Sequence, residues 1–167
     1  EAGVPLASMQ IQYSLLDPRA ENGMVQLARE KGFGILCYGT LAGGFLTDAW
    51  LNQPEPAEGT LTNRSLIKYK LIIDDFGGWA LFQELLGALD AVAKRHGTDI
   101  ATVASAAMLA RPGVSAVIVG ARGFRDRGRD EARLHGREAR IVRLHRLAPA
   151  AFEQRASGGR QGNGVTL

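Results

Sequence analysis

The sequence of 167 residues contains a single cysteine, Cys37, which excludes an intrachain disulfide and a cysteine-ligated zinc site. It has no apolar run near the ~20 residues that a membrane-spanning helix needs, and its opening Glu-Ala-Gly-Val shows no signal peptide. A single cysteine and no visible signal peptide together predict a cytoplasmic protein, because disulfides are rare in that reducing compartment. The missing initiator methionine leads us to expect that more of the protein precedes residue 1.

Motifs of several enzyme classes are also missing. The sequence has no Gly-x-Ser-x-Gly elbow, no P-loop and no Gly-x-Gly-x-x-Gly fingerprint, so neither a hydrolase triad nor a Walker or Rossmann nucleotide site is supported. Its three histidines, His96, His135 and His145, do not cluster with acids at ligand spacing. We therefore predict no metal site.

Acidic and basic residues are divided unevenly along the chain, although its formal net charge is only +3. Residues 1–120 hold nine Lys and Arg against twelve Asp and Glu, whereas residues 121–167 hold eleven Arg, no Lys and five acids. Such asymmetry can mark a tail that binds nucleic acids or membranes. The tail has no nucleic-acid motif and few aromatic residues for base stacking, so we disfavour a nucleic-acid partner.

Hydrophobic periodicity predicts a mixed α/β fold for residues 1–120, with strands from alternating or short apolar runs and helices from three- and four-residue spacing. The predicted strands are 7–13, 34–38 and 115–119, and the predicted helices are 22–31, 81–95 and 99–110. Strands joined through helices favour a parallel sheet. Residues 39–79 show neither period and are predicted to form a long functional loop.

Local details accompany these elements. Met9, Ile11 and Tyr13 alternate with glutamines and are expected to share the buried face of the first strand. Asn22 and Thr98 are expected to cap the helices that follow them. Beyond residue 120 neither period continues, so no strand or helix is predicted there.

The most informative stretch for function lies at the end of the second predicted strand. That strand ends in an aromatic residue, Tyr38, and is followed by a segment with Gly39, Gly43 and Gly44. Parallel α/β folds bind ligands at the carboxyl ends of their strands, where glycines let backbone N–H groups approach a phosphate. The tyrosine ring could stack on a flat ligand; alternatively, Tyr38 is a core residue and the glycines form a flexible turn.

Four segments connect this stretch to a known family. They are ASMQIQYSLL (7–16), CYGTLAGGFL (37–46), NRSLIK (63–68) and VSAVIVGAR (114–122). In this order and spacing they resemble the C-terminal part of an aldo-keto reductase, including the branch that contains the beta subunits of voltage-gated potassium channels. The resemblance implies the C-terminal portion of a (β/α)8 TIM barrel, with three parallel strands and their helices, in a segment covering residues 1–122.

The resemblance also implies that the barrel is incomplete in this chain. Three strands of a barrel leave an unpaired edge on either side, and Ile35 and Val117 are expected to face the barrel interior. Residues 123–167 depart from the family pattern, which continues with a helix that contacts the adenine. We interpret them as a divergent, irregular Arg-rich tail, either disordered or translated out of frame.

By resemblance, the chain binds the cofactor of an oxidoreductase that reduces aldehydes and ketones by hydride transfer. Gln10 would hydrogen-bond the nicotinamide carboxamide, and Tyr38 would stack on the nicotinamide ring. The backbone lining the pyrophosphate would come from Gly39, Leu41 and Gly43. Arg64 and Arg122 would face the adenosine phosphates, and Gly120, just before Ala121 and Arg122, would also belong to the cofactor site. Because guanidinium groups suit a 2′-phosphate, NADP is favoured over NAD.

The family's catalytic Tyr, Lys, Asp and His lie on earlier strands, so no catalytic residue is assigned in this chain. We expect a cofactor-binding fragment that is inactive alone and that belongs to a longer enzyme acting on a small carbonyl substrate. The alternative is a non-catalytic, nucleotide-sensing regulatory or interaction module, as the channel subunits suggest.

Overall fold

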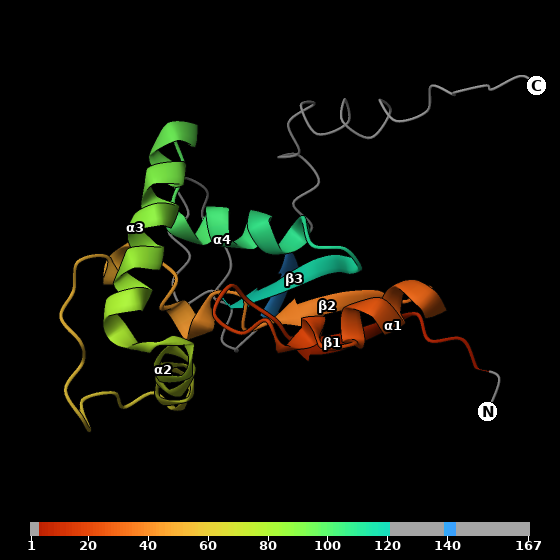
Figure 1. The fold of residues 1–167 in the computed structure, drawn as a ribbon, viewed down its shortest axis with the longest axis horizontal. Helices are drawn as coiled ribbons and strands as arrows, with labels where there is room; N and C mark the ends of the chain where they lie inside the picture. The colour runs from red at the N-terminus through yellow and green to blue at the C-terminus, as the bar shows by residue number, and fades with distance from the viewer. Residues whose placement is uncertain (1–3, 121–138, 143–167) are drawn as a thin grey trace, which may run out of the picture.

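The computed structural model describes residues 4–120 and, as backbone only, residues 139–142 (Figure 1). The strands are β1 (Ser8–Gln12), β2 (Gly34–Tyr38), β3 (Val114–Gly120) and β4 (Ala139–Val142). The α-helices are α1 (Met24–Lys31), α2 (Arg64–Phe76), α3 (Gly78–His96) and α4 (Ile100–Leu109). Short 3-10 turns shape the connections at Arg19–Glu21, Ala42–Gly44 and Asp48–Trp50.

The sheet has the strand order β1-β2-β3-β4. β1 pairs in parallel with β2, and β2 in parallel with β3, which confirms the predicted parallel α/β arrangement. β4 pairs antiparallel with β3, in a stretch for which the sequence predicts no strand. The expectation of an unpaired edge beside β3 is therefore wrong, because backbone that is distant in sequence supplies the missing hydrogen bonds.

The ends of the helices follow local chemistry. Gly32 follows α1 with a left-handed φ of 73°, so the helix ends at Lys31, the predicted last residue. The predicted caps are each displaced by one residue: Gly23 precedes α1 in place of Asn22, and Asp99 caps α4 in place of Thr98. The Asp99 carboxylate accepts a backbone N–H of the first turn at 2.7 Å, and its negative charge suits the positive end of the helix.

α2 lies in the stretch that the sequence analysis assigns to a loop, and that part of the prediction is wrong. Asn63 begins the helix, because its side-chain oxygen accepts the N–H of Ser65 at 2.8 Å. Gly77 ends it with a φ of 133°, and α3 starts at the next residue. The periodic signal is weak because only Tyr69 and Ile73 of α2 are buried.

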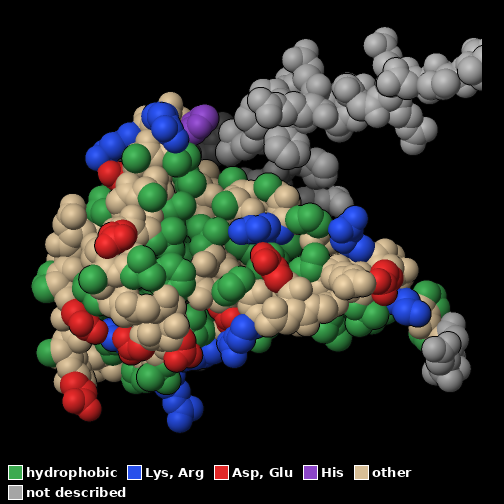
Figure 2. Space-filling model, viewed as in Figure 1, with side chains coloured by type: hydrophobic (Ala, Val, Ile, Leu, Met, Phe, Trp, Pro, Cys, Tyr) green, Lys and Arg blue, Asp and Glu red, His purple; other side chains and the backbone are tan. Residues whose placement is uncertain are grey.

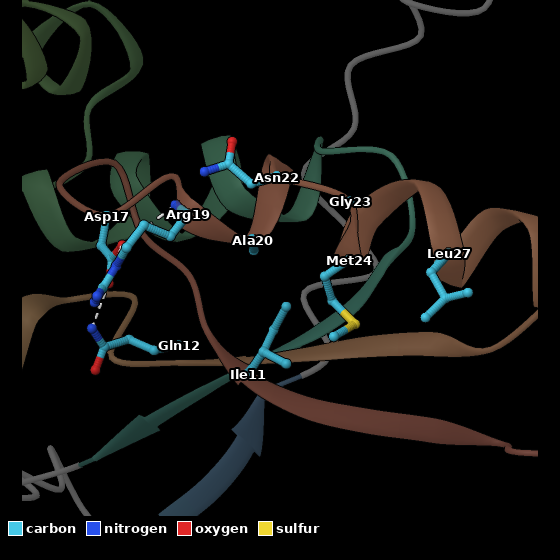
Figure 3. Close-up of a pocket in the computed structure, with 9 residues that line it drawn as sticks. All are labelled: Ile11, Gln12, Asp17, Arg19, Ala20, Asn22, Gly23, Met24 and Leu27. Atoms are coloured by element: carbon cyan, nitrogen blue, oxygen red, sulfur yellow. Dashed lines mark hydrogen bonds and ion pairs between the residues drawn. The ribbon is translucent and has the colours of Figure 1, made fainter.

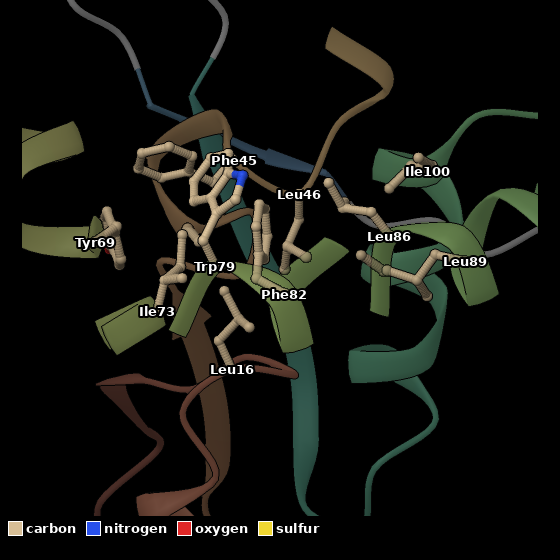
Figure 4. Close-up of a cluster of buried hydrophobic side chains, with 12 residues drawn as sticks. Leu16, Phe45, Leu46, Tyr69, Ile73, Trp79, Phe82, Leu86, Leu89 and Ile100 are labelled. Carbon is tan, nitrogen blue, oxygen red and sulfur yellow. The ribbon is translucent and has the colours of Figure 1, made fainter. Parts of the chain in front are cut away.

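An aromatic core forms where α2, α3 and the segment after β2 meet (Figure 4). Phe45 and Phe82 are completely buried, and their rings pack edge-to-face with centroids 6.0 Å apart. Trp79 packs against both rings, and its indole N–H donates to the carbonyl of Gln53 at 3.0 Å. This core attaches the glycine-rich segment after β2 to the helices.

A second buried cluster covers one face of the sheet. Ile35, Cys37 and Val117 are fully buried there against α1 and α4. The expectation that Ile35 and Val117 face a barrel interior is therefore wrong; alternation along β2 places Leu36 and Tyr38 on that opposite face. Burial raises the pKa of the Cys37 thiol to about 11, so this thiol is protonated and unreactive at neutral pH.

β1 is less buried than its alternating pattern predicts. The register pairs Met9 with Ile35 and Ile11 with Cys37, so both lie on the predicted face of the sheet. Tyr13 is only 2% exposed and Ile11 is half-buried, but Met9 is exposed. The second buried cluster, which contains Ile35, Cys37 and Val117, packs around the end of β1. The start of β1 is not covered by other described residues. Among the helices of the described part, none is long and apolar enough to cross a membrane.

Candidate functional site

Tyr38 is the last residue of β2, at the edge of the sheet toward which β2 and β3 both point in Figure 1. Its side chain is 39% exposed. The register places Tyr38 beside Gln12 and Ile118, and Gln10 beside Leu36. Paired residues and alternate residues of a strand share a face, so Gln10 and Tyr38 lie on the same side of the sheet.

The glycine-rich segment folds around one ring, that of Tyr69 in α2. A Cβ added at Gly39 would lie 2.2 Å from the Tyr69 hydroxyl oxygen, and one added at Gly43 would lie 2.7 Å from the ring. Both glycines have positive φ, of 71° and 66°, so conformation and packing each require glycine. Gly44 differs, because a Cβ there would meet nothing within 4 Å. Its backbone borders open space that a ligand could reach.

Backbone N–H groups of this segment divide into two sets. Those of Ala42 and Gly44 donate to the carbonyls of Gly39 and Leu41, at 2.8 and 2.9 Å. The N–H groups of Gly39, Leu41 and Gly43 donate to no backbone acceptor in the part of the chain that the structure describes. These three are the residues that the resemblance assigns to the pyrophosphate, and an anion would satisfy such donors.

The first two turns of α2 carry two cations, of which Lys68 lies close to Tyr38. Arg64 is the first residue of α2, Lys68 follows one turn later, and both are exposed. The Lys68 ammonium lies 5.6 Å from the ring centroid of Tyr38 and 5.0 Å from that of Tyr69, within cation–π range. A cation at the positive end of a helix is unfavourable by itself, so the position of Arg64 suits a bound anion better than it suits the helix.

The structure thus gathers several of the predicted cofactor residues. Tyr38 and the glycine-rich segment lie against the first turns of α2, where Arg64 is found in a helix and not in the predicted loop. Gly120 ends β3 at the same edge of the sheet, two residues after the partner of Tyr38. Gln10 shares the face but lies farther back. Arg122 lies outside the described residues.

Lys68 and Tyr69 are not among the site residues predicted from the sequence. Lys68 stands four residues after Arg64, the spacing that puts two side chains on one face of a helix. That signal becomes visible only when residues 64–76 are recognised as helical.

A groove of about 530 Å³ lies elsewhere, between β1 and α1 (Figure 3). Ile11 and Met24 contribute apolar side chains to it, and Gln12, Asp17 and Arg19 lie together at one end. None of its lining residues belongs to the predicted cofactor set. We therefore assign no nucleotide to this groove.

Asp17, at the end of that groove, is a buried carboxylate with several donors. Arg19 donates two hydrogen bonds of 2.7 Å, one to each carboxylate oxygen, and the Gln12 amide donates a third. The Arg19 guanidinium, with help from Gln12, holds the pKa of Asp17 below its usual value although burial acts in the opposite direction. This network fixes the turn that leads from β1 to α1.

Asp17→Asn is expected to lower the free energy of unfolding by about 1–3 kcal/mol at pH 7, because charge-assisted hydrogen bonds are lost. A carboxylate with a lowered folded-state pKa stabilises the fold above its unfolded pKa of about 4, and that contribution disappears as the pH falls through the folded-state pKa. The free energies of unfolding of wild type and variant, measured by urea denaturation, should therefore converge in acid. Asp90→Asn, which removes a surface ion pair with Lys94, serves as the control. An equal difference at pH 7 and in acid would contradict the role of the Asp17 charge.

The two buried tyrosines, Tyr13 and Tyr69, are held inside the fold. The Tyr13 hydroxyl donates to Glu21 at 2.6 Å, and burial, together with Glu21, raises the pKa of Tyr13. Burial likewise raises the pKa of Tyr69. Both phenols therefore hold their protons at neutral pH.

Within the described residues, no group of three or more His, Cys, Asp or Glu side chains could hold a metal ion.

Three parallel strands joined by helices, with a glycine-rich segment and an exposed aromatic ring at their carboxyl ends, are consistent with part of a β/α barrel. The model of the aldo/keto reductase family matches residues 1–125, and the chain belongs to that family. Both the resemblance and the fold class predicted from the sequence are thereby confirmed. The family generally uses nicotinamide cofactors.

The chain is also similar to individual curated proteins, one of which is named an aldo-keto reductase. Flagellar radial spoke protein 5 of Chlamydomonas reinhardtii is 30% identical over 106 residues, which cover 62% of this chain and 20% of that protein. Protein tas of Escherichia coli strain K12 is 30% identical over 118 residues, or 70% of this chain and 32% of that protein. An aldo-keto reductase of Babesia bovis is 28% identical over 128 residues, which cover 74% of this chain and 44% of that protein. The matches thus span less than half the length of these curated relatives.

Proposed function

We propose that this chain forms the cofactor-binding part of an NADP(H)-dependent aldo-keto reductase of the cytoplasm, which reduces a small aldehyde or ketone. Family membership supports oxidoreductase function. The observation that carries the proposal is the exposed Tyr38 ring at the carboxyl edge of the sheet, beside the glycine-rich segment and the cationic start of α2. An aromatic face, backbone donors and cations are what a flat ring joined to phosphates needs.

Each group has a separate part in holding the nucleotide, which when bound supplies the hydride. Tyr38 stacks on the nicotinamide ring and fixes which ring face is presented, while Gln10, on the same sheet face, binds the carboxamide. The N–H groups of the glycine-rich segment bind the pyrophosphate. Arg64 binds the 2′-phosphate, and Gly120 borders the adenosine end. The proton donor and the carbonyl pocket belong to a longer protein that contains this chain, so the chain alone is inactive.

Titration of the chain with NADPH, followed by cofactor fluorescence, tests the proposal. Tyr38→Ala is expected to weaken binding about tenfold, because stacking on an aromatic ring contributes about 1–3 kcal/mol. Tyr38→Phe keeps the ring and should bind as wild type does. The proposal fails if Tyr38→Ala binds NADPH as tightly as Tyr38→Phe, or if the wild-type chain binds no NADPH.

The second candidate is a nucleotide-sensing interaction module without turnover. One relative carries the name of a flagellar radial spoke protein, which favours a structural role for at least that protein. The two candidates share the nucleotide site and differ in chemistry. Aldehyde-dependent oxidation of NADPH by a longer protein containing this chain supports the reductase, whereas nucleotide binding without oxidation supports the module.

A further inference from the structure

α2 carries apolar residues on two sides. Leu66, Tyr69 and Ile73 pack against the aromatic core. Ile67 and Leu71, one turn apart, point away from that core and are 46% and 62% exposed. A surface helix normally has one apolar stripe, so the second stripe calls for a covering partner.

The loop before α2 turns this second stripe into a groove of about 750 Å³. Leu61, Ile67 and Leu71 supply apolar surface, and the loop around Glu55 and Glu58 forms the opposite wall. Figure 2 shows acidic and apolar side chains over α2 and this loop, at the lower left, with Lys and Arg side chains among them. The groove shares no residue with the predicted cofactor set.

The wall of the groove is held in place before any partner arrives. Its start is fixed by the hydrogen bond from the Trp79 indole to Gln53. The Lys70 ammonium then joins the loop to the helix, through ion pairs of 2.7 Å with Glu55 and 2.5 Å with Asp74. A wall that is already ordered loses little conformational entropy when a ligand binds.

The charge around the groove selects the partner. Glu55, Glu58 and Asp74 outnumber Lys70, whose ammonium is paired with two carboxylates and largely covered. The rim therefore has a net negative charge around apolar surface. We propose that this groove binds a cationic amphipathic segment of a partner protein, with apolar side chains one helical turn apart seated on Ile67 and Leu71 and with Lys or Arg facing the carboxylates.

Fluorescence anisotropy of the full chain with a labelled 14-residue peptide tests this proposal. The peptide carries leucines at helical i, i+3, i+4 and i+7 positions and lysines elsewhere. We expect saturable binding that weakens with added salt, and about tenfold weaker binding both for a peptide with the same residues scrambled and for one with Glu in place of Lys. NADPH should not compete, because the groove lies apart from the proposed cofactor residues.

Variants identify the groove. Leu71→Ser and Glu58→Lys are each expected to weaken peptide binding about tenfold, whereas Leu81→Ser and Glu84→Lys, at exposed positions on α3, should leave it within twofold. Circular dichroism of all four variants checks that the fold is retained, and Leu71→Ala replaces Leu71→Ser if that variant does not fold. Equal binding by groove and control variants would overturn the proposal. So would concentration-dependent self-association of the chain that Leu71→Ser abolishes, because the occupant would then be a second copy.

Discussion

Phe82→Ala is expected to lower the free energy of unfolding by about 3–5 kcal/mol, the largest stability effect of any change considered for this chain. Phe82 is completely buried, and its ring contacts those of Phe45 and Trp79. Truncation removes apolar burial and leaves a cavity between α3 and the segment after β2. The loss is comparable to a large share of the 5–15 kcal/mol that stabilises an ordinary domain.

Leu81→Ala provides the matched control on the same helix. Leu81 is adjacent in sequence but 41% exposed, so its truncation should cost about 1 kcal/mol or less. Urea denaturation followed by tryptophan fluorescence measures both variants, because Trp50 and Trp79 belong to the same aromatic cluster. Similar midpoints for the two variants would show that the aromatic cluster does not carry the stability of the chain.

Arg64→Ala is expected to weaken NADPH binding about 10- to 100-fold and to change NADH binding little. This result rests on the proposed function, in which the Arg64 guanidinium binds the 2′-phosphate that only NADPH carries. A charge-assisted contact of this kind contributes about 1.5–3 kcal/mol. Arg64 is free to make it, since its side chain is exposed at the positive end of α2.

Parallel fluorescence titrations with NADPH and NADH check this expectation. Arg95 is an exposed arginine on α3, away from the predicted cofactor residues. The variant Arg95→Ala controls for the general loss of positive charge and should leave both affinities within twofold. Equal weakening for the two nucleotides would remove Arg64 from the 2′-phosphate and assign it to a part that both nucleotides share. Higher ionic strength should narrow the NADPH preference of the wild type, because salt screens exposed charges.

Lys68 became a candidate only through the structure. Its position over the rings of Tyr38 and Tyr69 depends on a helix that sequence periodicity did not indicate. The same helix changes the interpretation of the glycine-rich segment. Gly39 and Gly43 are required by Tyr69 packing and by positive φ whether or not a phosphate binds, so their presence alone does not identify a nucleotide site.

The sequence by itself determined β2, β3, α3 and α4, because short β-rich apolar runs and long helical periodicity are strong local signals. It also determined the family and the placement of Tyr38 at the end of a strand. These properties are encoded within short windows of residues, where each position is read against near neighbours.

Only the tertiary structure decided which face of the sheet the helices cover, and it reversed the expected orientation of Ile35 and Val117. Both faces of a central parallel strand read as apolar, so the sequence pattern does not distinguish them. The same holds for the pairing of β4 with β3 and for the groove beside α2. Each depends on segments far apart in sequence meeting in space, and contacts of that kind leave no periodic trace in either segment alone.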